Sequence, residues 1–180
     1  KRRVFFMSNE RVRIVVEGAL MVALAFVLSL VKIPTGAYGG SVTLGSMIPI
    51  IVFALRHGVG PGLLVGTVHG LLQMIAEPVI VHPVQVLLDY ILAFGVLGLA
   101  GLFQDRPALG TAVAVGARFV SHFISGVVWW GAFAYEGMNV WLYSLVYNGT
   151  YLLPELIISV LIVNYVLKPF LNEKTTPRQV

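Results

Sequence analysis

Long apolar runs, separated by short polar or glycine- and proline-rich joints, dominate the chain. A helix that crosses a bilayer needs about 20 mostly apolar residues, and six stretches approach that pattern. The second stretch is short, which predicts a helix that is tilted or only partly spanning. We therefore expect an all-α membrane protein with six transmembrane helices, folded as a single integral membrane domain over residues 1–180. The six stretches cover residues 13–31, 41–55, 58–76, 83–103, 108–130 and 140–167.

Composition and charge agree with this architecture. The chain is 58% hydrophobic and 11% charged, whereas a soluble domain carries roughly 25% charged residues. It has no cysteine, which excludes disulfides and thiolate metal sites. With six spans, ten of the twelve lysines and arginines fall on the side of both termini, so the positive-inside rule predicts cytoplasmic termini. Lys32 falls on the other side and Arg118 lies within a span.

Polar side chains inside the last three apolar stretches recur at helical spacing. Residues four apart share one face of a helix, and ionisable groups in lipid are costly and usually mark a site. The polar groups converge near the outer ends of these stretches, which favours a small-molecule pocket open to the outside. The groups are Gln85 and Asp89 in the fourth stretch, Arg118, His122, Gly126 and Trp130 in the fifth, and Tyr143, Tyr147, Tyr151 and Asn148 in the sixth.

Most of these residues have a structural interpretation beside the functional one. Asp89 needs a partner, which is either Arg118 or a ligand cation. Gly126 allows a flat ring to approach the backbone, and Asn148 suits either a ligand edge or an interhelical hydrogen bond. His69 is interpreted as a buried, hydrogen-bonded histidine rather than a proton relay. Glu155 is interpreted as a partner of free backbone groups or of Arg118, not as a ligand.

The first apolar stretch carries two small residues four apart, Ala19 and Ala23. Small residues at this spacing let another helix approach closely. The neighbour is either a helix of the same bundle or a separate membrane subunit that docks on this face.

The sequence lacks the motifs that mark several classes of function. There is no phosphate-binding loop, no metal-ligand spacing and no nucleophile elbow. We therefore expect no ATP hydrolysis by this chain, no enzyme activity, no metal and no cofactor. The basic residues cluster at the ends and in short loops, so we expect no nucleic-acid partner.

Taken together, the ordered motifs are specific. They are Gly39-Gly40-Ser41-Val42, His82-Pro83-Val84-Gln85-x-Leu87-Leu88-Asp89-Tyr90, Arg118-x-x-x-His122-x-x-x-Gly126 and Trp141-x-Tyr143-Ser144-Leu145-x-Tyr147-Asn148. Over about residues 11–168 the chain resembles the thiamine-specific S-component of energy-coupling factor (ECF) transporters. Some members of that family carry glutamate in place of Asp89 and aromatic residues in place of Gly40 and His69.

The resemblance implies a six-helix fold in a prokaryotic plasma membrane, with an extracytoplasmic pocket for thiamine. It implies partners as well, a transmembrane T-component and two cytoplasmic ATPases, with docking at Ala19 and Ala23. Four further residues are assigned to ligand contact or support: Tyr38, His69, Arg118 and Tyr147. The pocket residues that it implies are Gln85, Asp89, Tyr90, His122, Gly126, Trp130, Tyr143 and Asn148.

The favoured hypothesis is thus a thiamine-binding subunit powered by a separate ATPase module. An alternative is a stand-alone secondary transporter, coupled to protons through Asp89, His122 or Glu155. A third possibility, an intramembrane enzyme using His122 with Asp89, lacks a nucleophile or metal motif. A fourth keeps the family and changes the ligand to a free pyrimidine or to riboflavin.

Overall fold

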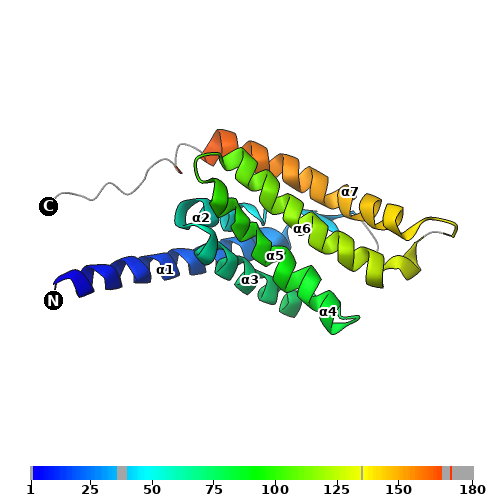
Figure 1. Ribbon diagram of the computed structural model, residues 1–180, viewed down its shortest axis with the longest axis horizontal. Helices are drawn as coiled ribbons and strands as arrows, with labels where there is room; N and C mark the ends of the chain where they lie inside the picture. The colour runs from blue at the N-terminus through cyan, green and yellow to red at the C-terminus, as the bar shows by residue number, and fades with distance from the viewer. Residues whose placement is uncertain (1, 36–39, 135, 168–170, 172–180) are drawn as a thin grey trace.

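The computed structural model describes residues 2–35, 40–134, 136–167 and 171, with side chains from residue 10 onward. It is a bundle of long helices (Figure 1). Within the described residues, five helical segments are long and apolar enough to cross a membrane. They comprise α1 (Arg2–Leu30), α3 (Val59–Ala76), the fourth segment (Pro83–Phe103), α6 (Pro107–Trp129), and α7 (Val140–Leu161) continued by η4 (Ile162–Leu167). The predicted all-α membrane fold is confirmed.

The second predicted stretch is wrong at its start. Residues of β2 (Ser41–Thr43) form an antiparallel hairpin with β1 (Lys32–Pro34), in which Ile33 pairs with Val42. The helix α2 (Ile48–His57) begins only after Gly45, whose φ of 80° terminates the extended segment. Ten residues of helix rise about 15 Å, half of a hydrocarbon core of about 30 Å. The partly spanning alternative is therefore the correct one.

The short α2 lies inside the bundle rather than against lipid. Most of its apolar side chains, including Ile50, Ile51 and Phe53, have almost no exposed surface. The longer α1 extends well beyond its predicted start at residue 13, because the polar segment before it contains no glycine or proline to stop the helix. Its inner face packs on α2 and α3, with Gly18, Val22, Ala25 and Ser29 buried.

The fourth segment is helical but irregular. It consists of α4 (Pro83–Val86), η1 (Leu87–Leu92), α5 (Ala93–Gly95) and η2 (Val96–Phe103), of which η1 is a π-helical turn. Such turns leave backbone groups to be satisfied from outside and are frequent at functional sites. Here the hydroxyl of Ser121 on α6 donates to the Leu88 carbonyl at 2.7 Å. On the other side α3 packs backbone to backbone, since a Cβ at Gly70 would lie 2.3 Å from the Tyr90 carbonyl oxygen.

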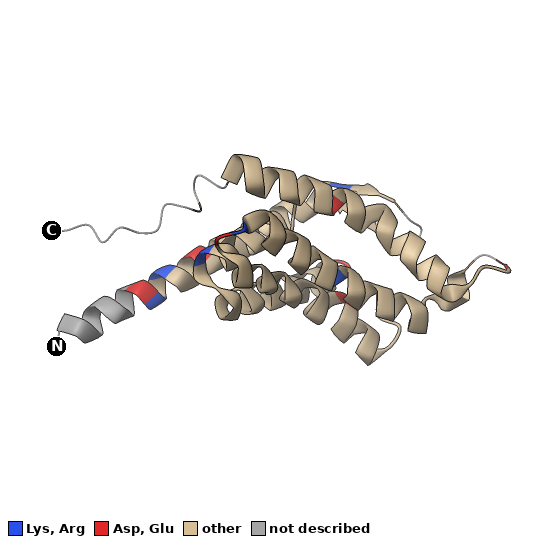
Figure 2. Cartoon of the chain, turned by 45° about the horizontal axis from the view of Figure 1, so that its top comes forward, with Lys and Arg blue, Asp and Glu red and all other residues tan. Residues whose placement is uncertain are grey.

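Charged residues are sparse along the bundle, with long stretches of helix carrying none (Figure 2). One cluster joins α1 to α2, where Glu17 pairs with Arg56 at 2.8 Å and with His57 at 3.2 Å. The side chain of His57 is only 15% exposed and packs on Phe53. The start of α1 and the end of η4 lie toward the same end of the bundle (Figure 1).

Candidate ligand-binding site

A cavity of about 180 Å³ lies between the β1–β2 hairpin, α3, the fourth segment, α6 and α7. A single water needs only about 15 Å³ by this measure, so the cavity has room for a small organic molecule. Its lining includes all eight residues that the resemblance assigns to the pocket, and Arg118 and Tyr147 as well. His69 does not line it, and Tyr38 lies outside the described residues.

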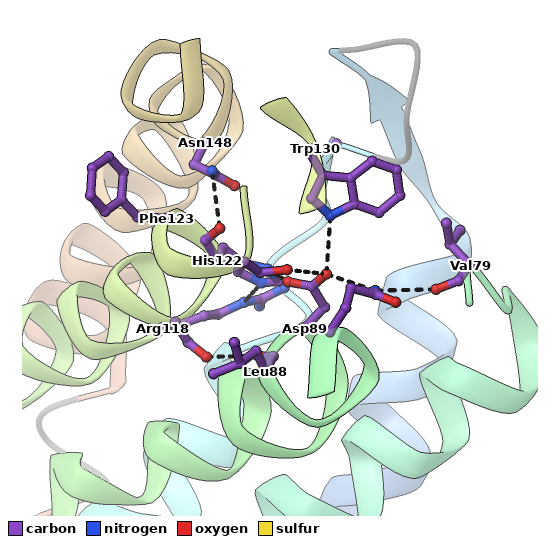
Figure 3. A network of polar contacts seen from close by, with 12 residues as sticks. Val79, Leu88, Asp89, Arg118, His122, Phe123, Trp130 and Asn148 are labelled. Atoms are coloured by element: carbon purple, nitrogen blue, oxygen red, sulfur yellow. Dashed lines mark hydrogen bonds and ion pairs between the residues drawn. The ribbon is translucent and has the colours of Figure 1, made fainter. Parts of the chain in front are cut away.

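Asp89 is the centre of a hydrogen-bond network on one wall of this cavity (Figure 3). Its Oδ2 accepts from Gln85 Nε2 and from Ser125 Oγ, each at 2.8 Å, and from Trp130 Nε1 at 3.4 Å. Its Oδ1 lies 3.1 Å from Nδ1 of His122. The π-helical turn η1 presents Asp89 to α6, which contributes two of these four donors, and Trp130 directly after the end of α6 contributes a third. The carboxylate is thereby fixed in position before any ligand arrives.

Arg118 adopts neither of its two predicted ion pairs. Within the described part of the chain it forms no ion pair with Asp89 or with Glu155. Instead its Nε donates to His122 Nε2 at 3.3 Å, and its guanidinium carbon lies 4.1 Å from the centre of the Phe94 ring. Because a guanidinium only donates, Nε2 of His122 must accept. The imidazole hydrogen is therefore on Nδ1, where it donates to Asp89.

Gln85 and Tyr90 hold the loop between α3 and α4. The Gln85 amide accepts from Val81 N at 3.1 Å and donates to Val79 O at 3.2 Å, while also binding Asp89. The Tyr90 hydroxyl accepts from Val79 N at 2.9 Å and donates to Glu77 O at 2.8 Å. Both residues line the cavity and shape its rim through these backbone contacts.

The opposite wall is made by α7, packed tightly on α6. A Cβ at Gly126 would lie 2.2 Å from Ser144 Oγ, so the gap expected beside Gly126 for a flat ring is filled by Ser144. Asn148 Nδ2 donates to Ser144 O at 2.9 Å and to His122 O at 3.4 Å, and its Oδ1 accepts from Tyr151 at 2.6 Å. The interhelical interpretation of Asn148 thus applies, while Asn148 also faces the cavity.

Some family members carry aromatic side chains where this chain has Gly40 and His69. Beside Gly40, tyrosine side chains from α7 take up the space. A Cβ at Gly40 would lie 2.9 Å from Tyr151 Cδ1 and 3.1 Å from the Tyr147 hydroxyl oxygen. Gly40 N donates to that hydroxyl at 2.9 Å. The two tyrosine rings thus occupy the space beside Gly40. His69 is fully buried, and its Nε2 lies 3.2 Å from Gln73 Nε2. Its Nδ1 has no hydrogen-bond partner among the described residues, so the interpretation as a hydrogen-bonded histidine holds for one ring nitrogen only.

Sequence reasoning missed the part of the cavity that the hairpin provides. Thr43 and Ser46 lie in a short polar segment with no helical periodicity, and only the folded hairpin brings them to α7. Tyr151 continued the four-residue spacing of Tyr143 and Tyr147, a signal that was available. Glu155 was interpreted as a partner of free backbone groups or of Arg118. It accepts from Thr43 N and from Thr43 Oγ1, and it lines the cavity.

Within the described residues, no group of three or more histidines, cysteines or acidic residues is placed to hold a metal ion. The cavity offers hydrogen-bonding groups, aromatic faces and ionisable side chains that include Asp89, Arg118, His122 and Glu155. A further pair, Lys32 with Glu77, forms an ion pair at the more exposed rim. This arrangement suits the recognition of a small polar, aromatic or charged molecule.

Comparisons with known proteins agree with the fold and the cavity. The family model described as "Thiamine transporter protein" matches residues 15–174. The chain is 38% identical to the thiamine transporter ThiT of Bacillus subtilis over 86% of this chain and 90% of that protein. It is 32% identical to the thiamine transporter ThiT of Lacticaseibacillus paracasei, covering 89% of each.

A solved structure has the same fold. The structure of ThiT from Listeria monocytogenes matches with a TM-score of 0.82 and 30% sequence identity, covering 91% of this chain and 98% of that one. Relatives named as transporters agree with the expectation that this chain is not an enzyme. The family model thus covers most of this chain, and the two relatives are covered over 90% and 89% of their own length. The chain therefore belongs to the thiamine transporter protein family.

Proposed function

We propose that this protein is the thiamine-binding membrane subunit of an ECF-type vitamin transporter. The observation that carries the proposal is the cavity itself, in which the family's motif residues Asp89, His122, Trp130, Tyr143 and Asn148 meet. Thiamine joins an aminopyrimidine to a permanently cationic ring. A cavity that combines aromatic faces, amide and hydroxyl groups, and carboxylates matches each of these parts.

Each wall of the cavity has a role in this proposal. Trp130 offers a large ring on which a cationic heterocycle stacks favourably. Asp89, already oriented by its donors, supplies negative charge in surroundings where charge interactions are stronger than in water. Tyr143 and Asn148 on α7 line the opposite side and provide polar groups for the pyrimidine edge.

Transport would depend on separate subunits. Ala19 and Ala23 are exposed on α1, beside exposed Leu20 and Leu24, so they do not pack inside the bundle. This small-residue face supports docking onto a transmembrane T-component, with two cytoplasmic ATPases supplying the energy, in the plasma membrane of a prokaryote. Capture outside and reorientation on the partner would then deliver the vitamin.

Calorimetric titration of the purified protein with thiamine tests the binding step. We expect heat release and quenching of tryptophan fluorescence at micromolar thiamine or below. The absence of both signals would refute the proposal. Uptake into proteoliposomes separates the two transport hypotheses, since an ECF subunit needs its partners and ATP, whereas a stand-alone transporter works without them and stops when an uncoupler is added.

A further inference from the structure

Glu155 is a second carboxylate at the cavity, on α7 and opposite the Asp89 network. The residue is only 3% exposed, and it lines the cavity. Its Oε1 accepts two hydrogen bonds from Thr43, one from the backbone N and one from Oγ1. Its Oε2 is buried and has no hydrogen-bond partner among the described residues. Two donors on one oxygen are typical of an ionised carboxylate, and a buried charge needs compensation.

Among the described residues, the cavity interior holds one permanent cation, Arg118, against two carboxylates, Asp89 and Glu155. Arg118 donates to His122, which donates to Asp89, so one cation and one anion are joined through a neutral imidazole. Lys32 and Glu77 pair at the rim. Glu155 forms no ion pair among the described residues. Arg118 interacts electrostatically with Glu155 as well as with Asp89, so the interior without ligand carries one net negative charge.

The position of Glu155 places it on the floor of the cavity. The helices α6 and α7 run antiparallel, with Gly126 against Ser144 and His122 against Asn148 and Tyr151. One turn further along α7 brings Glu155 to the depth of Arg118 on α6. A monovalent organic cation bound beside the Asp89 network would thus lie between that network and the Glu155 carboxylate.

From this arrangement we infer that Glu155 is the net counter-charge for a permanently monocationic ligand and sets the preference of the cavity for a cation over a neutral isostere. The inference rests on the proposed function and deepens it. Arg118 offsets only one of the two carboxylate charges, and the two oxygens of Asp89 already bind four donors, whereas Oε2 of Glu155 binds none of the described residues. Binding of one fixed positive charge makes the interior electrically neutral only when Glu155 is counted.

The test compares thiamine with an isosteric analogue whose thiazolium is replaced by a neutral thiophene. Affinities of both compounds are measured by calorimetry for the wild-type protein and for Glu155→Gln, which keeps the acceptor for Thr43 and removes the charge. We expect thiamine affinity to fall at least about tenfold, or about 1.4 kcal/mol. The affinity for the neutral analogue should change by less than about threefold, roughly 0.7 kcal/mol. Thr43→Val, which removes the hydrogen bonds of Oγ1 to Glu155 and Ser46 but no charge, should leave the ratio of the two affinities unchanged.

Each outcome decides the inference. If Glu155→Gln lowers the affinities for both compounds by the same factor, or lowers neither, Glu155 does not act through its charge and the inference is overturned. Should Glu155→Gln fail to fold, Glu155→Asp replaces it, because this variant withdraws the charge by one methylene. For Glu155→Asp, the ratio of thiamine affinity to analogue affinity should fall by about two- to fivefold. An unchanged or raised ratio overturns the inference. A wild-type protein that binds no thiamine refutes the proposed function instead, and the inference with it.

Discussion

Close packing of α6 on α7 sets the width of the cavity, and replacing Gly126 by alanine tests this directly. The added Cβ would lie 2.2 Å from Ser144 Oγ, 3.0 Å from Ser144 Cβ and 3.2 Å from Asn148 Nδ2. Ser144 has little freedom to move, because its hydroxyl donates to Phe123 O at 2.8 Å. The overlap must therefore be relieved by a shift of the helices.

The expected cost follows from a matched control on the same helix. A Cβ at Gly116 meets nothing within 4 Å, so Gly116→Ala gains helix propensity of up to about 1 kcal/mol without overlap. Overpacking in a well-packed core costs about 1–3 kcal/mol. Gly126→Ala should therefore be less stable than Gly116→Ala by about 1–3 kcal/mol, and thiamine affinity should fall at least about tenfold because both walls are displaced.

Thermal unfolding in detergent, with and without thiamine, measures both effects. Adding Ser144→Ala to Gly126→Ala removes the closest contact and should restore part of the stability, with a coupling of about 0.5–3 kcal/mol. Equal melting temperatures for Gly126→Ala and Gly116→Ala, or no coupling to Ser144→Ala, would refute the packing argument.

Three further substitutions follow from the site. Asp89→Asn replaces one acceptor oxygen by a donor in a network of four donors, and calorimetry should show thiamine affinity reduced by more than about tenfold; unchanged affinity would reject a role for this carboxylate. Tyr147→Phe removes the acceptor for Gly40 N, so stopped-flow tryptophan fluorescence should show thiamine dissociating several-fold faster, whereas an unaltered rate would mean that this contact does not retain the ligand. Replacing Ala19 and Ala23 together by leucine should leave thiamine binding within about twofold and abolish uptake in proteoliposomes with the partner subunits; full uptake would place docking elsewhere.

The helices and most of the site could be predicted because their signals are local. Apolar runs of sufficient length specify spanning helices, and four-residue spacing places Asp89 with Gln85, and His122 with Trp130, on shared faces. All eight pocket residues that the family resemblance implies line the cavity. The predicted start of the second helix failed because residues 41–43 pair with β1, a contact between segments that periodicity within either one does not show.

It was harder to predict what each residue of the site binds than to predict which residues line the cavity. Whether Arg118 meets Asp89, Glu155 or His122 depends on how three segments are packed, and the structure selects His122. Gly126 was expected to leave a gap, yet Ser144 from another helix fills it. In each case the partner comes from a distant part of the chain.

By itself, then, the sequence determined a multi-span membrane protein, the family's motifs and the faces on which polar groups lie, because hydrophobicity and helical spacing are properties of single segments. Only the tertiary structure decided which polar groups satisfy one another. The π-helical segment η1 directs Asp89 toward α6, and the hairpin brings Thr43 to Glu155. Burial makes an unpaired charge costly, so these pairings decide which groups are left for a ligand, and they leave Oε2 of Glu155 without a partner among the described residues.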